Sequence, residues 1–264
     1  MKPVHILVTR PDPVATEWAQ WLRTQGYQPH LASVLRLVPL DTLAEIQAIK
    51  QVVLDFDRYH KAIFVSRHAV YAAMNWLTDY WPQLPLGVSY FAVGETTAKT
   101  LAQYDIEVTA LGDANSPMNS EHLLTDESLQ QVEDERVVIF RGTTGRDLMR
   151  DILTERGAEV DYCALYRREL PPEAPAALTA FMQQVRADQQ PSVVTVHSGE
   201  SLMNLATAAR RAGLLSELQS LPLVVPALRV AMIASDLGFS HVHSARNAAD
   251  AAMLETIERC LAEA

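Results

Sequence analysis

Two stretches of this sequence, FVSRHAVYAAMN at residues 64–75 and TVHSGESLMNLA at residues 195–206, follow the same pattern. Each begins with apolar residues typical of a buried strand, continues through a turn that contains serine, and then places apolar residues at helical spacing. The segments that come next also correspond, since residues 91–108 and 223–242 both predict strand, turn, helix and short strand. The repetition predicts an α/β protein with two similar halves.

The order of the repeats indicates which parts of the chain fold together. The N-terminal strand and helix have no close continuation, and the last third of the chain has no opening strand. We therefore expect residues 1–35 to fold with residues 172–264 as one discontinuous domain, and residues 41–165 to form the other. The two connecting segments, about 36–40 and 166–171, are extended and favour strands, so they can pair as a two-stranded linker.

The composition is that of a globular protein. The chain has 264 residues, of which 48% are hydrophobic and 20% charged, enough for one large domain or two small ones with their own cores. No apolar run approaches the roughly 20 residues of a membrane helix. The opening MKPVHILVTRPD lacks the features of a signal peptide. We expect a cytoplasmic protein without a membrane segment.

Charge and cysteine content exclude further classes. With 22 basic and 32 acidic residues, the net charge is -10 when histidine is neutral, and no cluster of lysine and arginine suits a nucleic acid backbone. Nucleic acid is therefore not an expected partner. The two cysteines, Cys163 and Cys260, are far apart in the sequence, so they predict reduced thiols and no structural zinc.

Several common catalytic motifs are missing. The first predicted strand is followed by Thr9-Arg10-Pro11 instead of the glycine-rich turn of dinucleotide-binding proteins, and the chain has no P-loop, HExxH or Gly-x-Ser-x-Gly motif. The residues therefore predict no metal site and no nucleotide cofactor.

The predicted turns between strand and helix are rich in serine, threonine and glycine. Such turns place free backbone N–H groups at helix N-termini, which bind anions, and in parallel sheets they lie where ligands bind. Each serine or threonine could instead be only a helix cap, the commoner role. Together they predict a ligand with several carboxylates or phosphates, held between two lobes, with Arg10, Arg67 and Arg141 as charge partners. The turns are Thr9-Arg10, Ser66-Arg67, Gly94-Glu95-Thr96-Thr97, Arg141-Gly142-Thr143-Thr144-Gly145 and Ser198-Gly199-Glu200.

One tyrosine stands out in the second connecting segment. Tyr166 lies in ALYRRE, where it could donate a proton or a hydrogen bond to a ligand, although packing of an amphipathic ring is at least as common.

The order and spacing of five segments resemble the uroporphyrinogen-III synthase family. The chain departs from the family at residues 225–231, VPALRVA, where the family has a turn with glycine and threonine. The segments that carry the resemblance are ILVTRP, FVSRHAV, FAVGETTAKTL, FRGTTGRDLMRDILTERGAEVDYCALYRR and VTVHSGES.

The resemblance implies two flavodoxin-like parallel-sheet domains joined by a two-stranded β linker, with the active site in the cleft. It also implies a lyase that dehydrates hydroxymethylbilane, a linear tetrapyrrole with several carboxylates. The tetrapyrrole closes through a spirocyclic intermediate that inverts ring D, which gives uroporphyrinogen III for heme and siroheme biosynthesis. The family requires neither a metal nor an organic cofactor, and we expect a monomer.

The resemblance assigns roles to single positions. Tyr166 matches the family tyrosine that assists departure of the hydroxyl, so it is the expected catalytic residue. Thr97, Ser66 and Ser198 match turn residues that bind substrate. The full set of expected substrate-binding residues is Thr9, Arg10, Ser66, Arg67, Gly94, Thr96, Thr97, Arg141, Gly142, Ser198 and Gly199.

Two alternatives stay open from the residues alone. The same cleft could belong to a two-lobed binding protein that captures a polycarboxylate without changing it. An acyl- or phosphoryl-transfer enzyme could use Ser198 or Ser66 as nucleophile, with His197 or His68 beside it in the sequence.

Overall fold

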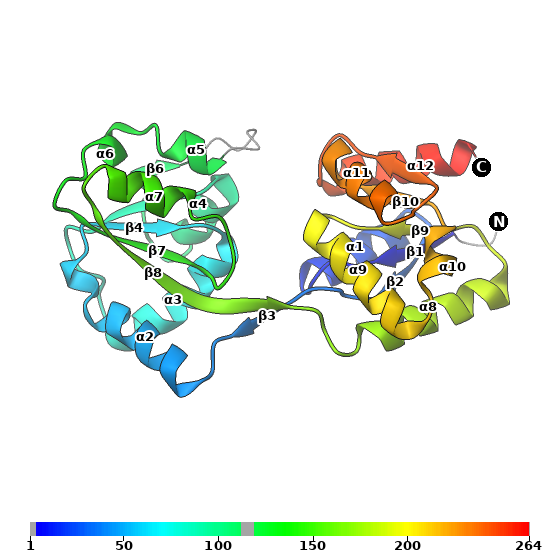
Figure 1. The fold of residues 1–264 in the computed structure, drawn as a ribbon, viewed down its shortest axis with the longest axis horizontal. Coiled ribbons are helices and arrows are strands. Elements are labelled where there is room, and N and C mark those ends of the chain that lie inside the picture. The colour runs from blue at the N-terminus through cyan, green and yellow to red at the C-terminus, as the bar shows by residue number, and fades with distance from the viewer. Residues whose placement is uncertain (1–3, 112–118, 264) are drawn as a thin grey trace. The chain divides into compact units, whose positions relative to one another are not determined.

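The chain forms two compact α/β units. A computed structural model describes residues 4–111 and 119–263. Unit 1 consists of residues 1–37 and 169–264, and unit 2 consists of residues 38–168. Figure 1 shows a sheet with helices in each unit. No helix among the described residues is long and apolar enough to cross a membrane.

Unit 1 contains a five-stranded sheet in the order β11-β10-β9-β1-β2, and all of its strand pairs are parallel. If its strands are numbered along the chain, the order is 2-1-3-4-5, which is that of flavodoxin. The strands are β1 (His5–Val8), β2 (Gln28–Leu31), β9 (Ser192–Thr195), β10 (Leu223–Val225) and β11 (Val242–Ser244).

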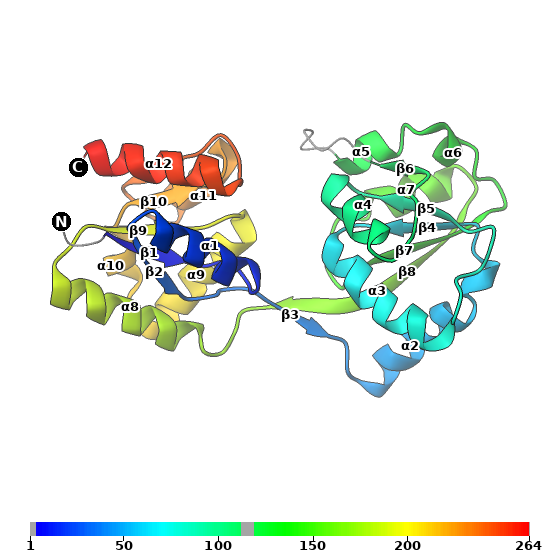
Figure 2. The same cartoon turned by 180° about the vertical axis from the view of Figure 1, so that it is seen from behind.

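Helices cover both faces of this sheet. Residues alternate along β1, so Ile6 and Val8 face one helical layer and Leu7 the other. The first layer is α1 (Val14–Thr24) with α12 (Asp250–Glu263), and Figure 2 shows α1 in front of the sheet. The second layer contains α8 (Ala174–Asp188), α9 (Gly199–Ala212), α10 (Leu215–Gln219) and α11 (Leu228–Asp236).

Unit 2 contains a six-stranded sheet in the order β3-β8-β7-β4-β5-β6. The five strands from β8 to β6 pair in parallel. Their order is the flavodoxin order with a permuted chain, because β7 and β8 follow β4, β5 and β6 in the sequence. The strands are β3 (Arg36–Pro39), β4 (Lys61–Phe64), β5 (Ser89–Ala92), β6 (Ala110–Leu111), β7 (Arg136–Gly142) and β8 (Glu159–Glu169).

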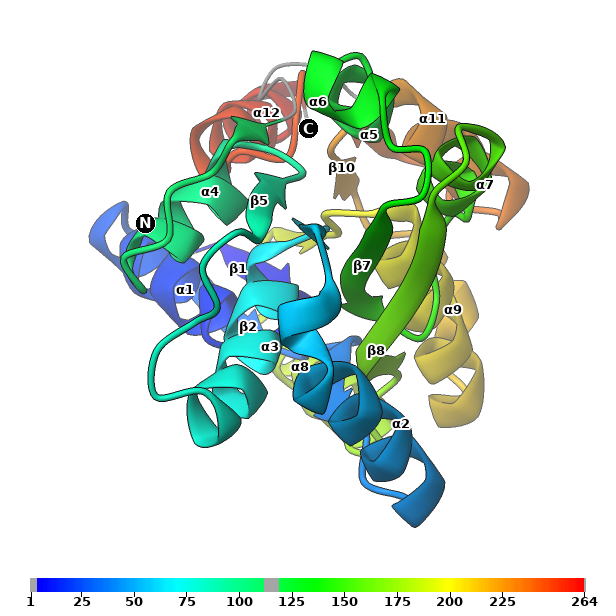
Figure 3. The same ribbon diagram turned by 90° about the vertical axis from the view of Figure 1, so that its left-hand side faces the viewer.

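The helices of unit 2 also form two layers, seen edge-on in Figure 3 with α7 and α3 on opposite sides of β7 and β8. A stack of phenylalanines, with Phe64 and Phe140 4.8 Å apart between ring centroids, fills part of the interior. The helices are α2 (Leu43–Leu54), the short 3-10 helix η1 (Phe56–Arg58), α3 (Arg67–Tyr80), α4 (Glu95–Ala102), α5 (Asn119–Leu123), α6 (Glu127–Gln130) and α7 (Leu148–Glu155).

The chain passes between the units within β3 and at the end of β8. These two strands are hydrogen-bonded neighbours, with Leu40 N donating to Leu165 O at 3.2 Å and Arg36 paired with Glu169 at 3.1 Å. Because β8 is one continuous strand of 11 residues, the segment expected as a separate linker at 166–171 begins inside a strand of the unit 2 sheet.

Each sheet has one pair of adjacent strands from which the following connections run to opposite sides of the sheet. In unit 1 this pair is β1 and β9, and in unit 2 it is β4 and β7. Ligands of such folds bind outside the carboxyl ends of the strands at this switch point. The two switch points are therefore the places where the predicted site residues are expected to meet a ligand.

Candidate functional site

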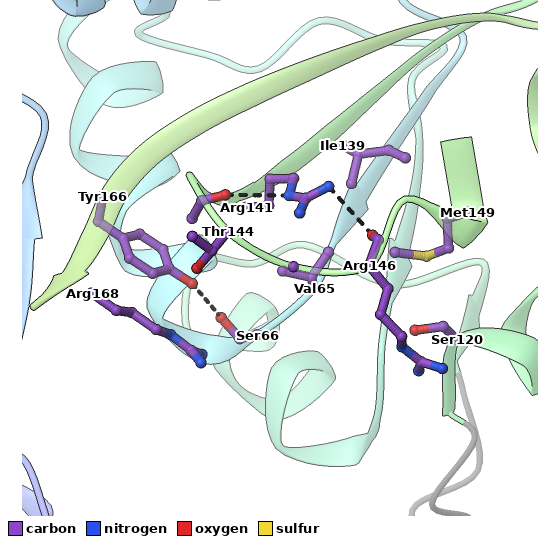
Figure 4. A pocket seen from close by; sticks show the side chains of 12 residues that line it. Val65, Ser66, Ser120, Ile139, Arg141, Thr144, Arg146, Met149, Tyr166 and Arg168 are labelled. Carbon is purple, nitrogen blue, oxygen red and sulfur yellow. Dashed lines mark hydrogen bonds between the residues drawn. The ribbon is translucent and has the colours of Figure 1, made fainter. Parts of the chain in front are cut away.

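A pocket of about 180 Å³ opens at the switch point of unit 2 (Figure 4). It is built by the residues that follow β4, by the end of β7 with the loop into α7, and by the last part of β8. Its lining residues are Val65, Ser66, Ser120, Ile139, Arg141, Gly142, Thr144, Gly145, Arg146, Met149, Tyr166 and Arg168.

A hydroxyl pair lies at the wall of this pocket. Ser66 caps α3, since its Oγ accepts a hydrogen bond from Ala69 N at 3.2 Å. The same Oγ lies 3.1 Å from the Tyr166 hydroxyl, and either group can be the donor. Tyr166 is only 4% exposed, so packing fixes its ring while the hydroxyl remains at the pocket. The structure thus joins a predicted catalytic residue to a predicted binding residue.

Gly142 makes the position of Tyr166 possible. The pairing of β7 with β8 shifts between Arg141 and Gly142, which leaves Gly142 opposite Tyr166. A Cβ atom at residue 142 would lie 2.8 Å from Cε2 of the Tyr166 ring, closer than carbon atoms approach without repulsion. Gly142 was predicted as a binding residue. In the structure, its lack of a side chain leaves the space that the Tyr166 ring occupies.

Arg141 has partners within its own loop. Its Nε donates to Gly142 O at 3.2 Å, its Nη1 lies 3.1 Å from Asp147 Oδ1, and the guanidinium carbon lies 4.3 Å from the centroid of the Tyr162 ring. The side chain is buried. It therefore fixes the loop between β7 and α7, and its predicted contact with a ligand stays a prediction.

Three other arginines lie at the pocket or beside it. Arg146 and Arg168 line the pocket, and the Arg146 side chain is 63% exposed where it pairs with Glu121. Arg67 begins α3 directly after Ser66. Burial is the main cause that lowers the pKa of His68 to about 4, and the charges of Arg67 and Arg168 add to it, so these two arginines contribute a positive potential here. The N-terminus of α3 adds to this potential.

The predicted turn at residues 94–97 is partly helical. Gly94, with a φ of 96°, is the N-cap of α4, and the helix begins at Glu95. Thr97 is buried and its Oγ1 donates to Val93 O at 3.3 Å, whereas Thr96 is exposed. The Thr97 hydroxyl thus serves the helix in this structure, and its binding role stays a prediction.

At the switch point of unit 1, two threonines connect the central strands. Thr9 Oγ1 donates to Thr195 O and Thr195 Oγ1 donates to Leu7 O, both at 2.7 Å. Thr9 is fully buried, so its side chain holds β1 against β9. Beside it, Arg10 pairs with Asp250.

Ser198 is the N-cap of α9 in unit 1, as Ser66 is of α3 in unit 2. Its Oγ accepts from Ser201 N at 3.0 Å and donates to Ser201 Oγ at 2.9 Å. Gly199 follows as the first helical residue, and a Cβ there would lie 3.3 Å from Ile233 Cδ1. Both serines therefore cap helices, which was the alternative to binding for such turns, and the binding role of Ser198 stays a prediction.

The segment at residues 225–231, which departs from the family pattern, places apolar residues at the N-terminal end of α11. The N-cap of α11, Ala227, provides no side-chain hydrogen bond, and Leu228 and Met232 are 71% and 63% exposed.

His197 is a feature of unit 1 that sequence reasoning named only as a neighbour of Ser198. Its ring meets the ring of Trp18 edge-on, with centroids 4.8 Å apart. Among the described residues, neither imidazole nitrogen has a hydrogen-bond partner. Burial, with the charge of Arg10, lowers the pKa of His197 to about 3. A buried imidazole that is not bonded to Ser198 cannot activate that serine, which counts against a serine nucleophile.

Arg146 and Arg168 of the unit 2 pocket were not among the predicted site residues. Arg146 ends the segment RGTTGR and Arg168 ends ALYRR, so both lie within segments that had been singled out. Arg168 lies two residues after Tyr166 on β8, so the two residues share a face of the strand. The approach of Arg146 to Tyr166 depends on how β7, β8 and α7 meet, which the sequence pattern does not give.

The chain matches a known protein family along most of its length. The family model described as Uroporphyrinogen-III synthase HemD matches residues 16–255. Uroporphyrinogen-III synthase of Escherichia coli (strain K12) is 32% identical over 258 residues, which cover 97% of this chain and 100% of the relative. The protein of the same name from Salmonella typhimurium (strain LT2) is 29% identical over 258 residues, with the same coverage.

Solved structures have the same fold at low sequence identity. A crystal structure of a mutant uroporphyrinogen III synthase from Thermus thermophilus aligns with a TM-score of 0.60 and 15% identity, covering 99% of this chain and 100% of that one. The structure of uroporphyrinogen-III synthetase from Helicobacter pylori gives a TM-score of 0.61 and 16% identity, covering 97% and 99%. The predicted two-domain α/β fold class is confirmed.

The contact between Gly142 and Tyr166 predicts a coupling in stability. We expect Gly142→Ala to lower the free energy of unfolding of unit 2 by about 1–3 kcal/mol through overpacking. Tyr166→Ala removes the ring that the new methyl group would meet, so the double variant should lose less than the sum of the two single variants. Urea unfolding of all four proteins measures this, and strictly additive losses would contradict the contact.

His197 predicts a pH-dependent stability of unit 1. Its pKa is about 3 in the folded protein and about 6.5 in the unfolded chain. Because the unfolded chain binds the proton first as pH falls, the free energy of unfolding should fall below pH 6.5, by about 2 kcal/mol at pH 5. His197→Phe keeps a ring against Trp18 and should remove this part of the pH dependence.

The measurement needs a signal from unit 1 alone. Trp18 and Trp21 lie in unit 1, and Trp76 and Trp81 in unit 2. Urea unfolding at pH 7 and pH 5, followed by tryptophan fluorescence in a Trp76→Phe/Trp81→Phe background, reports unit 1. An equal pH dependence with and without His197 would show that this imidazole is not the titrating group.

Proposed function

Since the chain belongs to the uroporphyrinogen-III synthase family, we propose that it dehydrates and cyclises hydroxymethylbilane to uroporphyrinogen III with inversion of ring D. The protein is then a lyase of tetrapyrrole biosynthesis. The observation that supports this most directly is the hydroxyl pair of Ser66 and Tyr166 in a pocket that arginines line.

In this proposal, Tyr166 assists departure of the substrate hydroxyl. Ser66 Oγ–H can donate to the Tyr166 oxygen at 3.1 Å, which leaves the phenol O–H directed to another acceptor. That acceptor is the hydroxymethyl oxygen, which leaves as water when its bond to carbon breaks. The buried ring holds the donor in one direction, so little reorganisation is needed when charge develops.

The cations of the pocket bind carboxylates of the substrate. Arg146 and Arg168 offer guanidinium groups, and the first turn of α3 offers backbone N–H groups. A volume of about 180 Å³ suits one carboxylate-bearing side chain rather than a whole tetrapyrrole. Binding the acidic side chain positions the reacting carbon, which is the main requirement when no covalent intermediate is used.

The switch point of unit 1 supplies further binding groups for the same substrate. Arg10 lies after β1, and Ser198 and Gly199 start α9. The proposed substrate-binding groups of unit 2 also include Arg67, Gly94, Thr96 and the loop around Arg141. We assign no nucleophile to any of them.

The proposal also covers the oligomeric state of the protein, its location in the cell and its need for a cofactor. We propose that it acts as a monomer in the cytoplasm, without a metal or organic cofactor. Both cysteines, Cys163 and Cys260, are free and buried, which suits a reducing compartment. Among the described residues, no three histidine, cysteine or acidic side chains are grouped to hold a metal ion.

The product isomer tests the function. Purified protein is mixed with freshly generated hydroxymethylbilane, and the oxidised products are separated into type I and type III isomers by chromatography. Because the uncatalysed reaction gives type I, an excess of type III supports the synthase. If folded protein binds the substrate and yields only type I, the two-lobed binding protein becomes the better account.

Tyr166→Phe tests the role of the phenol. It keeps the buried ring and removes the donor, so kcat should fall about 100-fold with little change in KM. Single substitutions of the binding residues should give smaller losses, and complete loss from Thr97→Ala alone would contradict this distribution of roles.

Tyr162→Phe is the matched control on the same strand. Its hydroxyl lies 3.5 Å from Asp147 O, and the residue does not line the pocket. Its kcat should stay close to that of the wild type. Equal losses in the two variants would show that strand β8, and not the Tyr166 hydroxyl, is what the substitution disturbs.

A further inference from the structure

A second concave site lies in unit 2 away from the hydroxyl pair. It is a groove of about 560 Å³ between the C-terminal ends of α3 and α4, next to the loop that precedes β5. In a parallel sheet this loop is at the amino end of the strands, opposite to the carboxyl ends where Ser66 and Gly142 lie. The groove is lined by Met74, Thr78, Trp81, Pro82, Gln83, Leu84, Pro85, Leu86, Tyr90, Tyr104, Asp105, Ile106 and Glu107.

Apolar side chains form part of the groove wall, and one of them is held by a hydrogen bond. Trp81 follows α3, and its indole N–H donates to Val53 O at 2.7 Å, which fixes the ring. Leu86, at the tip of the proline-containing loop, is 93% exposed. A leucine this exposed, next to an anchored indole, provides apolar surface to a ligand with little rearrangement.

A buried hydroxyl lies at the groove. Tyr90 lines it, and the Tyr90 hydroxyl oxygen is buried without a hydrogen-bond partner among the described residues. Burial raises the pKa of Tyr90 to about 12, so the phenol keeps its proton. The hydroxyl itself is out of reach of a ligand, so Tyr90 contributes its aromatic ring to the groove wall.

The charge at the groove is negative. Asp105 and Glu107 line it, and both residues are exposed. Asp105 has a φ of 57° at the end of α4, where Ile106 N donates to Leu101 O and turns the chain toward the groove. The C-terminal ends of two helices add negative potential. No lysine, arginine or histidine is among the lining residues.

We propose that this groove binds a small organic cation with an apolar body, such as an aryl- or alkyl-ammonium compound. The indole, leucine and proline side chains pack on the body, Asp105 and Glu107 attract the ammonium group, and Trp81 or Tyr104 can add a cation–π contact. The volume is within the range of ordinary small-molecule sites. The proposal is independent of the synthase reaction, since none of its residues belongs to the pocket with Tyr166.

Two fluorescent probes of equal body and opposite charge test the ligand class. Dansylcadaverine carries a primary ammonium group, and N-dansyl-6-aminohexanoate carries a carboxylate on a similar chain. Titration of the full-length protein at low salt should show about tenfold tighter binding of the cation, because two carboxylates attract it and repel the anion. Backbone and indole NMR shifts should change at Trp81 and along residues 82–86.

Variants show whether this groove causes the preference. Asp105→Asn, which tolerates the positive φ, combined with Glu107→Gln should reduce the preference to about twofold or less. Leu86→Ser should weaken both probes, because it removes exposed apolar surface that the fold does not need. Tyr90→Phe should leave the binding of both probes close to that of the wild type, because the ring stays and the hydroxyl is buried.

A matched control removes the same charge elsewhere in unit 2. Glu127 and Glu155 are exposed and do not line the groove, so Glu127→Gln/Glu155→Gln should keep the full preference for the cation. The proposal is overturned if the anion binds as tightly as the cation, if both double variants lose the preference equally, or if the NMR shifts lie outside the groove. Synthase activity is not part of this readout, so the two proposals fail separately.

Discussion

The parallel pairing of β4 with β7 is the constraint on which the candidate site depends. All four residues of β4 are buried and paired with consecutive residues of β7. The chain leaves these two strands toward opposite helical layers, so their carboxyl ends cannot be covered by one connection. Ser66, at the start of α3, and the loop that leads to α7 therefore border one pocket, although they are far apart in the sequence.

An irregularity in the neighbouring pair of strands completes the pocket. The shift between β7 and β8 lies where Gly142 faces Tyr166, and the missing side chain lets the phenol ring lie across the backbone. Arg141, one residue earlier, anchors the loop that follows. The Arg141 Nη2 atom would lie 2.6 Å from a Cβ at Gly145, whose φ is 153°. Each glycine thus leaves space for one side chain, Gly142 for Tyr166 and Gly145 for Arg141.

Unit 1 repeats the architecture with different chemistry. Its switch point has the serine cap and an arginine, but the central polar group is a buried imidazole against Trp18 rather than a phenol at a pocket. An imidazole surrounded in this way stays neutral near pH 7 because burial and Arg10 both oppose its charge. The similar sequence repeats thus specify similar backbones, while the side chains at equivalent places differ in protonation and exposure.

The sequence by itself determined the α/β class, the two halves, the serine turns at Ser66 and Ser198 that are able to cap helices, and the family. These follow from hydrophobic periodicity and short-range hydrogen bonds, which neighbouring residues set. Only the tertiary structure decided which side chains meet. Thr9 and Thr97 were predicted to bind a ligand, yet their hydroxyls bond to main-chain carbonyls. Tyr166 reaches Ser66 because strand order and a β irregularity place them together, and long-range packing of this kind leaves no local pattern in the sequence.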